Sequence, residues 1–382
     1  MSIAKRCANS CAPRWTTSAT RKPRTSATPF TSSIRRESDE VVIAHRLDLD
    51  RGWFFAAGPE GDVVLSTHVR LGRNVAGYPF LPLLSAEART EISEAVRTVL
   101  DGRDEEFGAF SDPLDQTALL LRERRLVDVP PQHAGDVFVR ADQGVTVTLF
   151  DDDHVRVSAS RSGCAWADAL SDARTIADIV DTELPFAVSL HWGYMGPDPN
   201  ASGAAIRASA LVHLPALMDS PQAHEAVSGA LEPGIAIKAF RSSGAHSLGN
   251  VYLLESGTHP GWNETKILDE LANSVSRLVH YERESRELLL NERRDETRES
   301  VERALALLRN AAAIRADDAM QLLSWVRLGI ALGLTDEIGM EEVTSLLFLS
   351  QKSHLMQSGD RPEDNEDDCR AHLLRRCLAA RG

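Results

Sequence analysis

The sequence contains few cysteines and no long apolar run. Only five cysteines occur in 382 residues, and no two of them form a CxxC pair. This spacing argues against a disulfide framework and a zinc site, and it predicts a reducing compartment, which we take to be the cytoplasm. No apolar run approaches the roughly 20 residues that a membrane-spanning helix needs, so we expect neither a membrane span nor a membrane partner.

Acidic residues are missing from the first 36 positions, which carry eight lysines and arginines. The whole chain has a net charge of −14, so the remainder is more acidic still. Such a body repels phosphate backbones, and we expect no nucleic-acid partner. The basic, Ser/Thr-rich leader, residues 1–44, has the composition of an organelle transit peptide. A disordered tail or a mis-assigned start codon explains the same composition, and we favour these two.

The rest of the composition is that of a soluble globular protein, with 43% hydrophobic and 26% charged residues. Its length allows one large domain or two ordinary ones. Up to residue 262, β-like runs outnumber helical patterns, which favours an α+β fold with a large antiparallel sheet flanked by helices. The β-like runs are 62–67, 136–140, 145–150, 154–160, 186–192, 207–214, 235–240 and 250–256, and the helical patterns are 85–100, 166–181 and 220–230.

The pattern changes near Asn263. From there to about residue 313, leucines recur at helical spacing among charged residues, with one break, and further helical patterns follow to residue 379. We therefore predict an α+β domain over residues 45–262 and a helical C-terminal domain over residues 263–382. The first long helix is interpreted as scaffold or as the surface of a homodimer.

Basic residues of the α+β part occupy strand positions or strand ends. Arg70 follows the first strand, Arg156 lies in "DDDHVRV", Arg207 follows the small-residue loop "PDPNASGAA", and Lys238 lies in "IKAF". One strand arginine is usually a surface residue, but a sheet can bring four such residues to one concave face. Several fixed donors around one charge suit a triphosphate, and the loop can add backbone N–H groups.

Five segments resemble, in order, segments of the bacterial protein-arginine kinases, which belong to the ATP:guanido phosphotransferases (phosphagen kinases). The segments are "VVLSTHVRLGRNVAGYPF", "DDDHVRV", "IRASALVHLPAL", "SLGNVYLLES" and "LLSWVRLGIALGL". The resemblance covers about residues 48–380. It implies a large antiparallel sheet with helices, Mg-ATP held by arginines, and phosphoryl transfer to an arginine side chain of a protein. The helical C-terminal part is similar to this subfamily and not to the creatine and arginine kinases.

On the nucleotide side, the resemblance implies a phosphate site that is partly retained. Arg70, Arg156 and Arg207 match family arginines, whereas His68 and Lys238 stand where the family has arginine. Lysine keeps the charge but loses the two-pronged hydrogen-bonding geometry of arginine. The nucleotide-binding residues that the resemblance implies are Ser66, Thr67, His68, Val69, Arg70, Arg125 (near a family histidine beside the adenine), Arg156, Arg207, Ala208, Ser209, Ala210, Leu211, Lys238, Ala239, Phe240, Arg241, Ser242 and Ser243.

On the acceptor side, less of the family pattern remains. A guanidinium is a poor nucleophile because it stays protonated, and the family uses two glutamates and a cysteine thiolate against it. Asp152, an acid one methylene shorter, matches the first glutamate and is the catalytic residue that the resemblance implies. Ser243 stands at the second glutamate. Pro197 or Asp198, depending on where one inserted residue is placed, stands at the cysteine.

The C-terminal stretch "EDDCRA" resembles the subfamily's RDxxRA motif, a phosphoarginine-binding pocket. Asp367, Arg370 and Ala371 match, and Glu366 replaces the first arginine. An acid at this position repels a phosphoryl group. The alternative interpretation is a capped terminal helix with no binding role.

Two functions are therefore open. The first is an ATP-dependent kinase for protein arginine, with ATP and Mg²⁺ as cofactors and a protein substrate, weakened by the missing carboxylate and thiolate. The second is a non-catalytic descendant that binds nucleotide or a regulated partner protein. Loss of one positioned catalytic group commonly costs about 10²–10⁴ in rate, so the loss of two favours trace activity or none. No metal site built by the chain alone is predicted.

Overall fold

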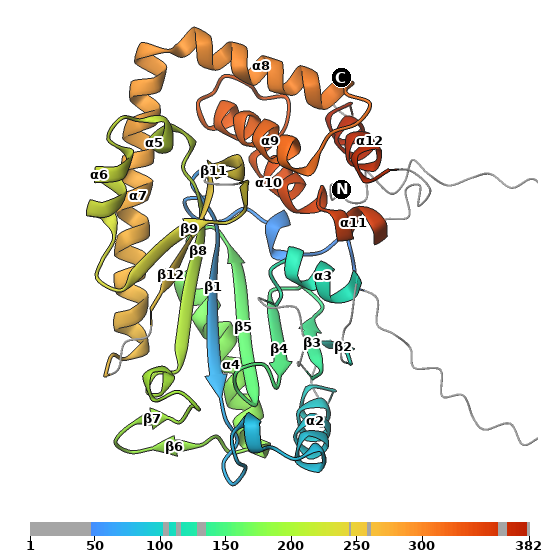
Figure 1. The fold of residues 1–382 in the computed structure, drawn as a ribbon, viewed down its shortest axis with the longest axis vertical. Helices are drawn as coiled ribbons and strands as arrows, with labels where there is room; N and C mark the ends of the chain where they lie inside the picture. The colour runs from blue at the N-terminus through green and yellow to red at the C-terminus, as the bar shows by residue number, and fades with distance from the viewer. Residues whose placement is uncertain are drawn as a thin grey trace, which may run out of the picture.

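A computed structural model describes residues 47–101, 107–111, 116–127, 135–243, 246–257, 261–357 and 365–379. The predicted leader, residues 1–44, lies outside these ranges. The described part is centred on an eight-stranded sheet in which all neighbouring strands are antiparallel (Figure 1). In spatial order the strands are β2 (Phe107–Phe110), β3 (Val137–Arg140), β4 (Val145–Leu149), β5 (Val155–Ser162), β1 (Val64–Arg73), β8 (Ile206–His213), β12 (Val251–Ser256) and β9 (Ile235–Ala239). The antiparallel sheet predicted from the sequence is confirmed.

Two short hairpins and the helices complete the chain. The hairpins are β6 (Val188–Ser189) with β7 (Gly193–Tyr194), and β10 (Ser242–Ser243) with β11 (His246–Ser247). The helices are α2 (Ala86–Asp101), α3 (Gln116–Glu123), α4 (Trp166–Glu183), α5 (Pro215–Asp219), α6 (Ala223–Ala230), α7 (Glu264–Glu292), α8 (Arg294–Asn310), α9 (Ala316–Ala331), α10 (Met340–Leu349), α11 (Lys352–Gln357) and α12 (Glu366–Ala379). The predicted strand 186–192 is instead the β6–β7 hairpin, and the long helical pattern breaks once, at Arg293.

One face of the sheet is covered by helices α4 and α7 (Figure 1). The C-terminal helices pack against one end of the other face, and among the described residues no helix covers its middle, which we call the open face. Alternate strand residues such as Val69 and Val157 point to the covered face and pack into the main apolar core. Helix α4 brings alanines at a spacing of four residues to this core, including Ala169 and Ala173, which lets it lie close to β1 and β5. The residues on the opposite face are therefore available for a binding site.

Helices α8 to α12 enclose a second apolar core at one end of the sheet. Trp53 and Phe54, in a 3-10 turn before β1, pack there against Phe348 of α10, and Leu305 of α8 belongs to the same core. Figure 1 shows α7 running along the sheet and α8 continuing from the upper end of α7 across the top of the view, next to α9. Helix α7 packs with the sheet, whereas α8 to α12 pack with one another. The domain boundary at residue 262 stays a prediction.

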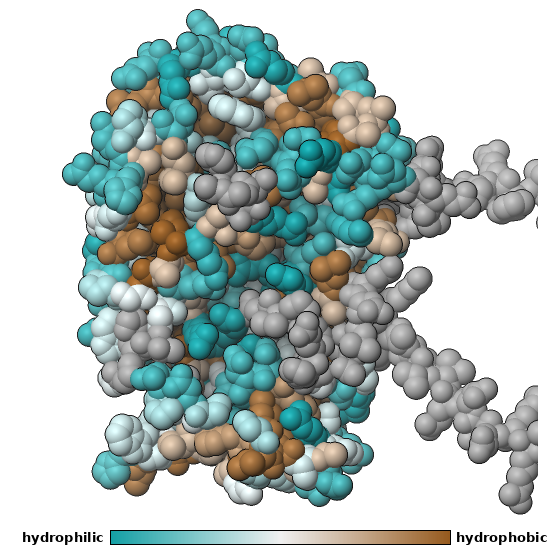
Figure 2. All heavy atoms as spheres, in the orientation of Figure 1, coloured by the Kyte–Doolittle hydropathy of each residue, from teal (hydrophilic) through white to brown (hydrophobic). Residues whose placement is uncertain are grey.

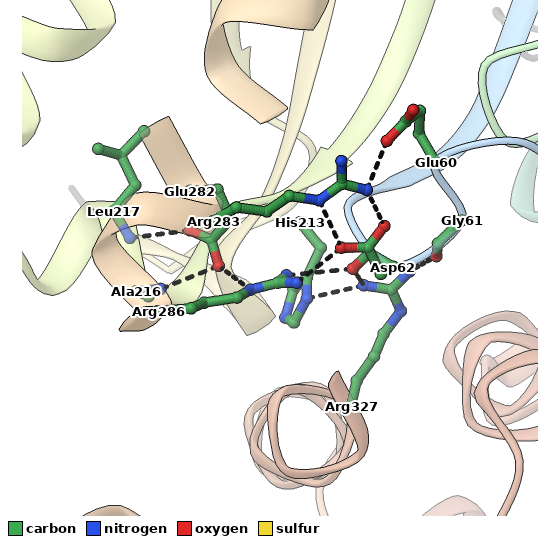
Figure 3. Close-up of polar contacts among 10 residues, drawn as sticks. All are labelled: Glu60, Gly61, Asp62, His213, Ala216, Leu217, Glu282, Arg283, Arg286 and Arg327. Atoms are coloured by element: carbon green, nitrogen blue, oxygen red, sulfur yellow. Dashed lines mark hydrogen bonds and ion pairs between the residues drawn. The ribbon is translucent and has the colours of Figure 1, made fainter. Parts of the chain in front are cut away.

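A cluster of charged side chains joins the two cores (Figure 3). We call Asp62, His213, Glu282, Arg286 and Arg327 the buried joint. Glu282 of α7 is completely buried, accepts from Arg286 Nε at 2.7 Å, and accepts from the backbone N–H groups that open α5. Arg286 in turn donates to the Asp62 carboxylate at 3.0 Å. The joint therefore ties α7, α5 and the segment before β1 together.

Arg327 of α9 is the buried joint's link to the C-terminal helices. It is completely buried and donates to the backbone carbonyls of Gly61 and Asp62 at 2.5 and 3.0 Å, and to His213 Nδ1 at 2.8 Å. Because His213 Nδ1 accepts this bond, its Nε2 carries the proton and donates to Ser324 Oγ at 2.8 Å. Burial, followed by the charges of Arg327 and Arg286, holds the pKa of His213 well below its usual value. The C-terminal helices are thus fixed to the end of β8.

Candidate functional site: two clefts on the open face of the sheet

Three arginines converge on the open face through strand register. Arg70 on β1 stands directly opposite Arg207 on β8, and Arg156 on β5 stands opposite Gly72 on β1. Because side chains alternate along a strand, all three point away from α4. Figure 2 shows hydrophilic side chains gathered across the middle of this face. The convergence that the sequence predicted for these arginines is present in the structure.

The same alternation places some of the residues predicted to bind nucleotide on the open face and others on the covered face. Ala208 and Ala210 point to the covered face and lie in the main core, as Val69 does. His68 is on the open face but is buried, and its Nδ1 shares a hydrogen bond of 2.7 Å with Ser160 Oγ. Thr67 accepts from the N–H of Ala165 on the covered face. Thr67, Val69, Ala208 and Ala210 could therefore contact a ligand on the open face only through their backbone groups. His68 could support such a ligand only from below, because its side chain is buried.

A first cleft, which we call the nucleotide cleft, has a volume of about 590 Å³. Cationic side chains dominate its polar lining, and apolar side chains form the rest of its walls. It is lined by Arg70, Leu119, Arg122, Glu123, Arg125, Val127, Lys238, Phe240, Arg241, Leu253 and Glu255. Five cations beside apolar walls match the triphosphate and the base of a nucleotide, so the residues present fit ATP.

Arg125 connects the two sides of the nucleotide cleft. It follows α3 with a positive φ of 56°, an unusual conformation for a residue with a side chain, and such conformations cluster at binding sites. Its Nη2 donates to Ser209 Oγ on β8 at 3.2 Å, and its guanidinium lies 5.6 Å from the ring centre of Phe240. The predicted residues Arg125, Ser209 and Phe240 are therefore neighbours here.

Glu123 ties the nucleotide cleft to the C-terminal helices. Its Oε2 accepts from the backbone N–H of Ser353, which lies in α11, at 3.0 Å. Burial raises the pKa of this carboxyl group, against the opposing charge of Arg241. The sequence offered no signal for Glu123 or Arg122 in this role, because the contact with α11 spans 230 residues. Lys238, as predicted at the site, lines the cleft with its ammonium 2.6 Å from Glu255.

A second cleft, which we call the acceptor cleft, has a volume of about 300 Å³ and shares Arg70 with the first. Unlike the nucleotide cleft, it combines arginines with several aspartates. It is lined by Arg70, Gly72, Asp152, Asp153, Arg156, Pro197, Asp198, Asn200, Ser202, Ala204, Ala205, Ile206, Arg207 and Ile267. Opposite charges in one small cleft suit a ligand that is itself part cation and part anion.

Two of the acceptor cleft's arginines differ in their partners. Arg156 is largely buried and is held by the Asp151 carboxylate and by Asp152 at 2.6 Å. Arg207 is exposed, and no acidic group of the described ranges forms an ion pair with it. An incoming anion would compete with two carboxylates for Arg156 but would meet Arg207 directly.

Asp153 lines the acceptor cleft but was missed by the sequence interpretation, which assigned only Asp152 of this run of three aspartates. Its Oδ1 accepts from Asn74 Nδ2 at 2.7 Å, and burial raises its pKa. A Cβ on Gly72 would lie 2.3 Å from Asp153 Oδ2, so only glycine lets this carboxylate approach β1. Asp152, by contrast, has a side chain that is 70% exposed.

The loop before β8 carries no thiol into the acceptor cleft. Pro197 and Asp198, the two candidates for the position of the family cysteine, both line it, and Asp198 Oδ1 accepts from the N–H of Asn200 at 2.9 Å. The described cysteines, Cys164, Cys369 and Cys377, are not among the lining residues of either cleft. Ser242 and Ser243 form β10, and the placement of their side chains lies outside the described part.

The predicted C-terminal cluster comes together on α12. Arg370 is completely buried and donates to the carbonyls of Ser350 and Ile314 at 2.8 and 2.9 Å. It also donates to Asp367 at 2.7 Å and forms an ion pair with Glu366. The guanidinium of Arg370 is therefore occupied by groups of its own chain, which favours the structural interpretation of this motif over a ligand pocket.

No group of three or more His, Cys, Asp and Glu side chains in the described ranges is arranged to hold a metal ion. None of the helices in those ranges is long and apolar enough to cross a membrane.

Comparisons with known proteins agree with the fold. The C-terminal catalytic domain of the ATP:guanido phosphotransferases matches residues 114–285, and the C-terminal domain of the protein-arginine kinase McsB matches residues 294–381. The chain is 27% identical to the protein-arginine kinase of Halothermothrix orenii over 331 residues, which cover 85% of this chain and 95% of that protein.

A second relative and a solved structure extend these comparisons. The protein-arginine kinase of Moorella thermoacetica is 29% identical over 349 residues, covering 87% of this chain and 99% of its own length. The duplicated taurocyamine kinase of Schistosoma mansoni, solved with transition-state-analogue components, superposes with a TM-score of 0.50 and 18% identity. That match covers 73% of this chain and 48% of the kinase. It shows a common fold and nothing further.

Proposed function

Because the chain belongs to the ATP:guanido phosphotransferase family and resembles its protein-arginine kinases, we propose that it binds Mg-ATP and slowly phosphorylates protein arginine. One observation carries the proposal. The strand register brings Arg156 and Arg207 into the acceptor cleft beside Arg70, which lines both clefts. Fixed cations at such a junction are what an in-line phosphoryl transfer requires, because charge develops on the transferring group.

In the nucleotide cleft, the chain's own residues would bind and orient the nucleotide. Bound Mg-ATP supplies the phosphoryl group and a cation that neutralises part of its charge. Arg70 lines both clefts and so is placed to contact the phosphate nearest the acceptor. Arg125 and Lys238 would bind other phosphate oxygens, while Phe240 offers an apolar wall to the base.

In the acceptor cleft, aspartates would orient the guanidinium of the acceptor arginine. Asp152 is exposed enough to reach it, and Asp153 supplies a second carboxylate from the cleft wall. In the transfer, a guanidinium nitrogen forms a bond to the γ-phosphorus as the bond to the bridging oxygen breaks. ADP leaves, and the proton lost from that nitrogen passes to Asp152 or to water. With no thiolate, we expect a slow reaction.

A second function, non-catalytic nucleotide binding, is favoured by a separate observation. The resemblance implies that Pro197 or Asp198 replaces the family cysteine and that Ser243 replaces a glutamate, and Arg156 is held by two aspartates of its own chain. These features weaken transfer more than binding, because the cations of the nucleotide cleft are unaffected. A regulator that responds to nucleotide would need only this cleft.

One experiment separates the two functions. The purified full chain is incubated with Mg-ATP and an arginine-rich protein, and acid-labile phosphoarginine and the nucleotide-induced rise in melting temperature are both measured. The kinase proposal expects both signals, each weakened in Arg70→Ala, because Arg70 lines both clefts. A rise in melting temperature without product at any enzyme concentration would overturn the kinase and support the regulator. Absence of both signals would overturn both functions.

A further inference from the structure

The β6–β7 hairpin exposes an unusual amount of apolar surface. Val188, Leu190 and Trp192 have exposed fractions of 59%, 103% and 71%. We call these three side chains the apolar tip. They are three of the nine exposed large hydrophobic residues of the described ranges, and all fall within five positions. Isolated exposed apolar residues are ordinary, but a cluster of large ones marks a contact surface.

Hydrogen bonds and a cation–π contact hold the hairpin in place. Ser189 Oγ accepts from the N–H groups of His191 and Trp192, both at 3.3 Å, which fixes the turn. At the base, the N–H of Ala187 donates to the carbonyl of Asn74 at 2.7 Å. The guanidinium of Arg73 lies 3.5 Å from the ring centre of Tyr194. A rigid surface loses little conformational entropy when a partner binds.

The same contacts connect the hairpin to the acceptor cleft. Asn74 Nδ2 donates both to the carbonyl of Met195, at the end of the hairpin, and to Asp153 of the cleft. Two residues further on, the chain itself enters the cleft wall at Pro197 and Asp198. Figure 1 shows the hairpin projecting beyond the lower end of the sheet. The base of the hairpin that carries the apolar tip is therefore directly connected to the wall of the acceptor cleft.

We propose that the apolar tip docks an extended segment of the acceptor protein whose arginine, flanked by apolar residues, enters the acceptor cleft. This proposal rests on the proposed function for the identity of the acceptor. Charge complementarity supports it, because Asp152, Asp153 and Asp198 line the cleft that would receive the cationic arginine. Three side chains offer too little area for a stable dimer, in which each partner buries about 800 Å². A single peptide segment matches their area better.

The test measures peptide binding without nucleotide, so that it does not depend on catalysis. Two fluorescent peptides carry one arginine each, flanked by leucines in one and by serines in the other, and binding is followed by anisotropy. Wild type should bind the leucine peptide about tenfold more tightly, the gain expected from burying one or two apolar side chains. The double variant Leu190→Ser/Trp192→Ser should lose this preference, and Trp192→Ser alone should lose part of it.

Leu288→Ser is the matched control, because Leu288 is 55% exposed on α7 and not on the hairpin. It should keep the tenfold preference. Equal binding of both peptides by wild type, or a preference that survives the double variant, would overturn the proposal. So would a wild-type dimer, seen by light scattering, that the double variant converts to monomer. If the preference behaves as expected but no phosphoarginine forms, the docking surface stands and the kinase function fails.

Discussion

Two groups of arginines in this chain are alike in the sequence and opposite in their surroundings. Arg70 and Arg207 lie on the open face of the sheet, at the mouths of clefts. Arg327 and Arg286 lie in the buried joint, where each donates to a backbone carbonyl of the same loop. A guanidinium whose donors are all used inside the chain holds the fold together, whereas one that faces a cleft can serve a ligand.

Arg370 resembles the arginines of the buried joint, although the sequence alone allowed either a phosphoarginine pocket or a structural role for its motif. It is as deeply buried as Arg327 and, like it, donates to two backbone carbonyls. Its remaining donors meet Glu366 and Asp367 of its own helix. Arg370 therefore belongs with the arginines of the buried joint in chemistry, although it lies on a different helix.

The largest expected effect comes from breaking the buried joint. Arg327→Met should lower the free energy of unfolding by about 3–5 kcal/mol, because it leaves the Gly61 carbonyl and His213 Nδ1 without a donor inside the buried joint. Urea denaturation followed by circular dichroism measures this. Arg303→Ala is the control, since Arg303 forms a surface pair with Glu299 and should change stability by less than about 1 kcal/mol. Equal effects of the two variants would contradict the contrast between the groups.

A smaller effect concerns the pH dependence of the buried joint. His213 stays neutral in the folded chain while the unfolded chain takes up a proton below a pKa of about 6.5. Protonation therefore favours the unfolded chain, and stability present at neutral pH is lost as the pH falls. Between about pH 7.5 and about pH 5.5 the loss is about 1.4 kcal/mol for one such histidine.

His354 should add a similar loss, because burial lowers its pKa to about 3. Its window therefore runs from about 6.5 down to about 3. Denaturation curves at several pH values, compared between wild type and His354→Gln, isolate this contribution. His280→Gln is the control, since His280 is 67% exposed on α7. If His354→Gln leaves the pH slope unchanged, His354 is not kept neutral by burial.

The sequence predicted the sheet and the three convergent arginines because strand patterns and ordered motifs are local. It could not separate Arg70 from Val69, or Arg207 from Ala208, as ligands, because that depends on which face of the sheet is covered by α4 and α7. Asp153 was missed for a related reason. Its position on the cleft wall depends on close approach to Gly72, which lies on a strand some 80 residues earlier.

Glu123 and the apolar tip illustrate the remaining limits of the sequence. The contact of Glu123 with Ser353 joins helices that no local pattern relates. The segment that contains Leu190 and Trp192 was predicted as a strand, since alternating apolar residues are typical of strands with one buried face. In the structure those residues occupy the exposed end of a short hairpin. Periodicity records alternation but not which side is covered.

The smallest effect tests Arg156, a cleft arginine that resembles the joint arginines. Because Asp151 and Asp152 hold its guanidinium, a phosphate must displace carboxylates to reach it. Asp151→Asn removes one competing charge and should tighten binding of Mg-ATP about three- to tenfold, measured by calorimetry, with little change in stability. Asp142→Asn is the control, since Asp142 pairs with Arg140 and lines neither cleft. Unchanged affinity in Asp151→Asn would place Arg156 with the structural arginines, and phosphate binding would then depend on Arg70 and Arg207.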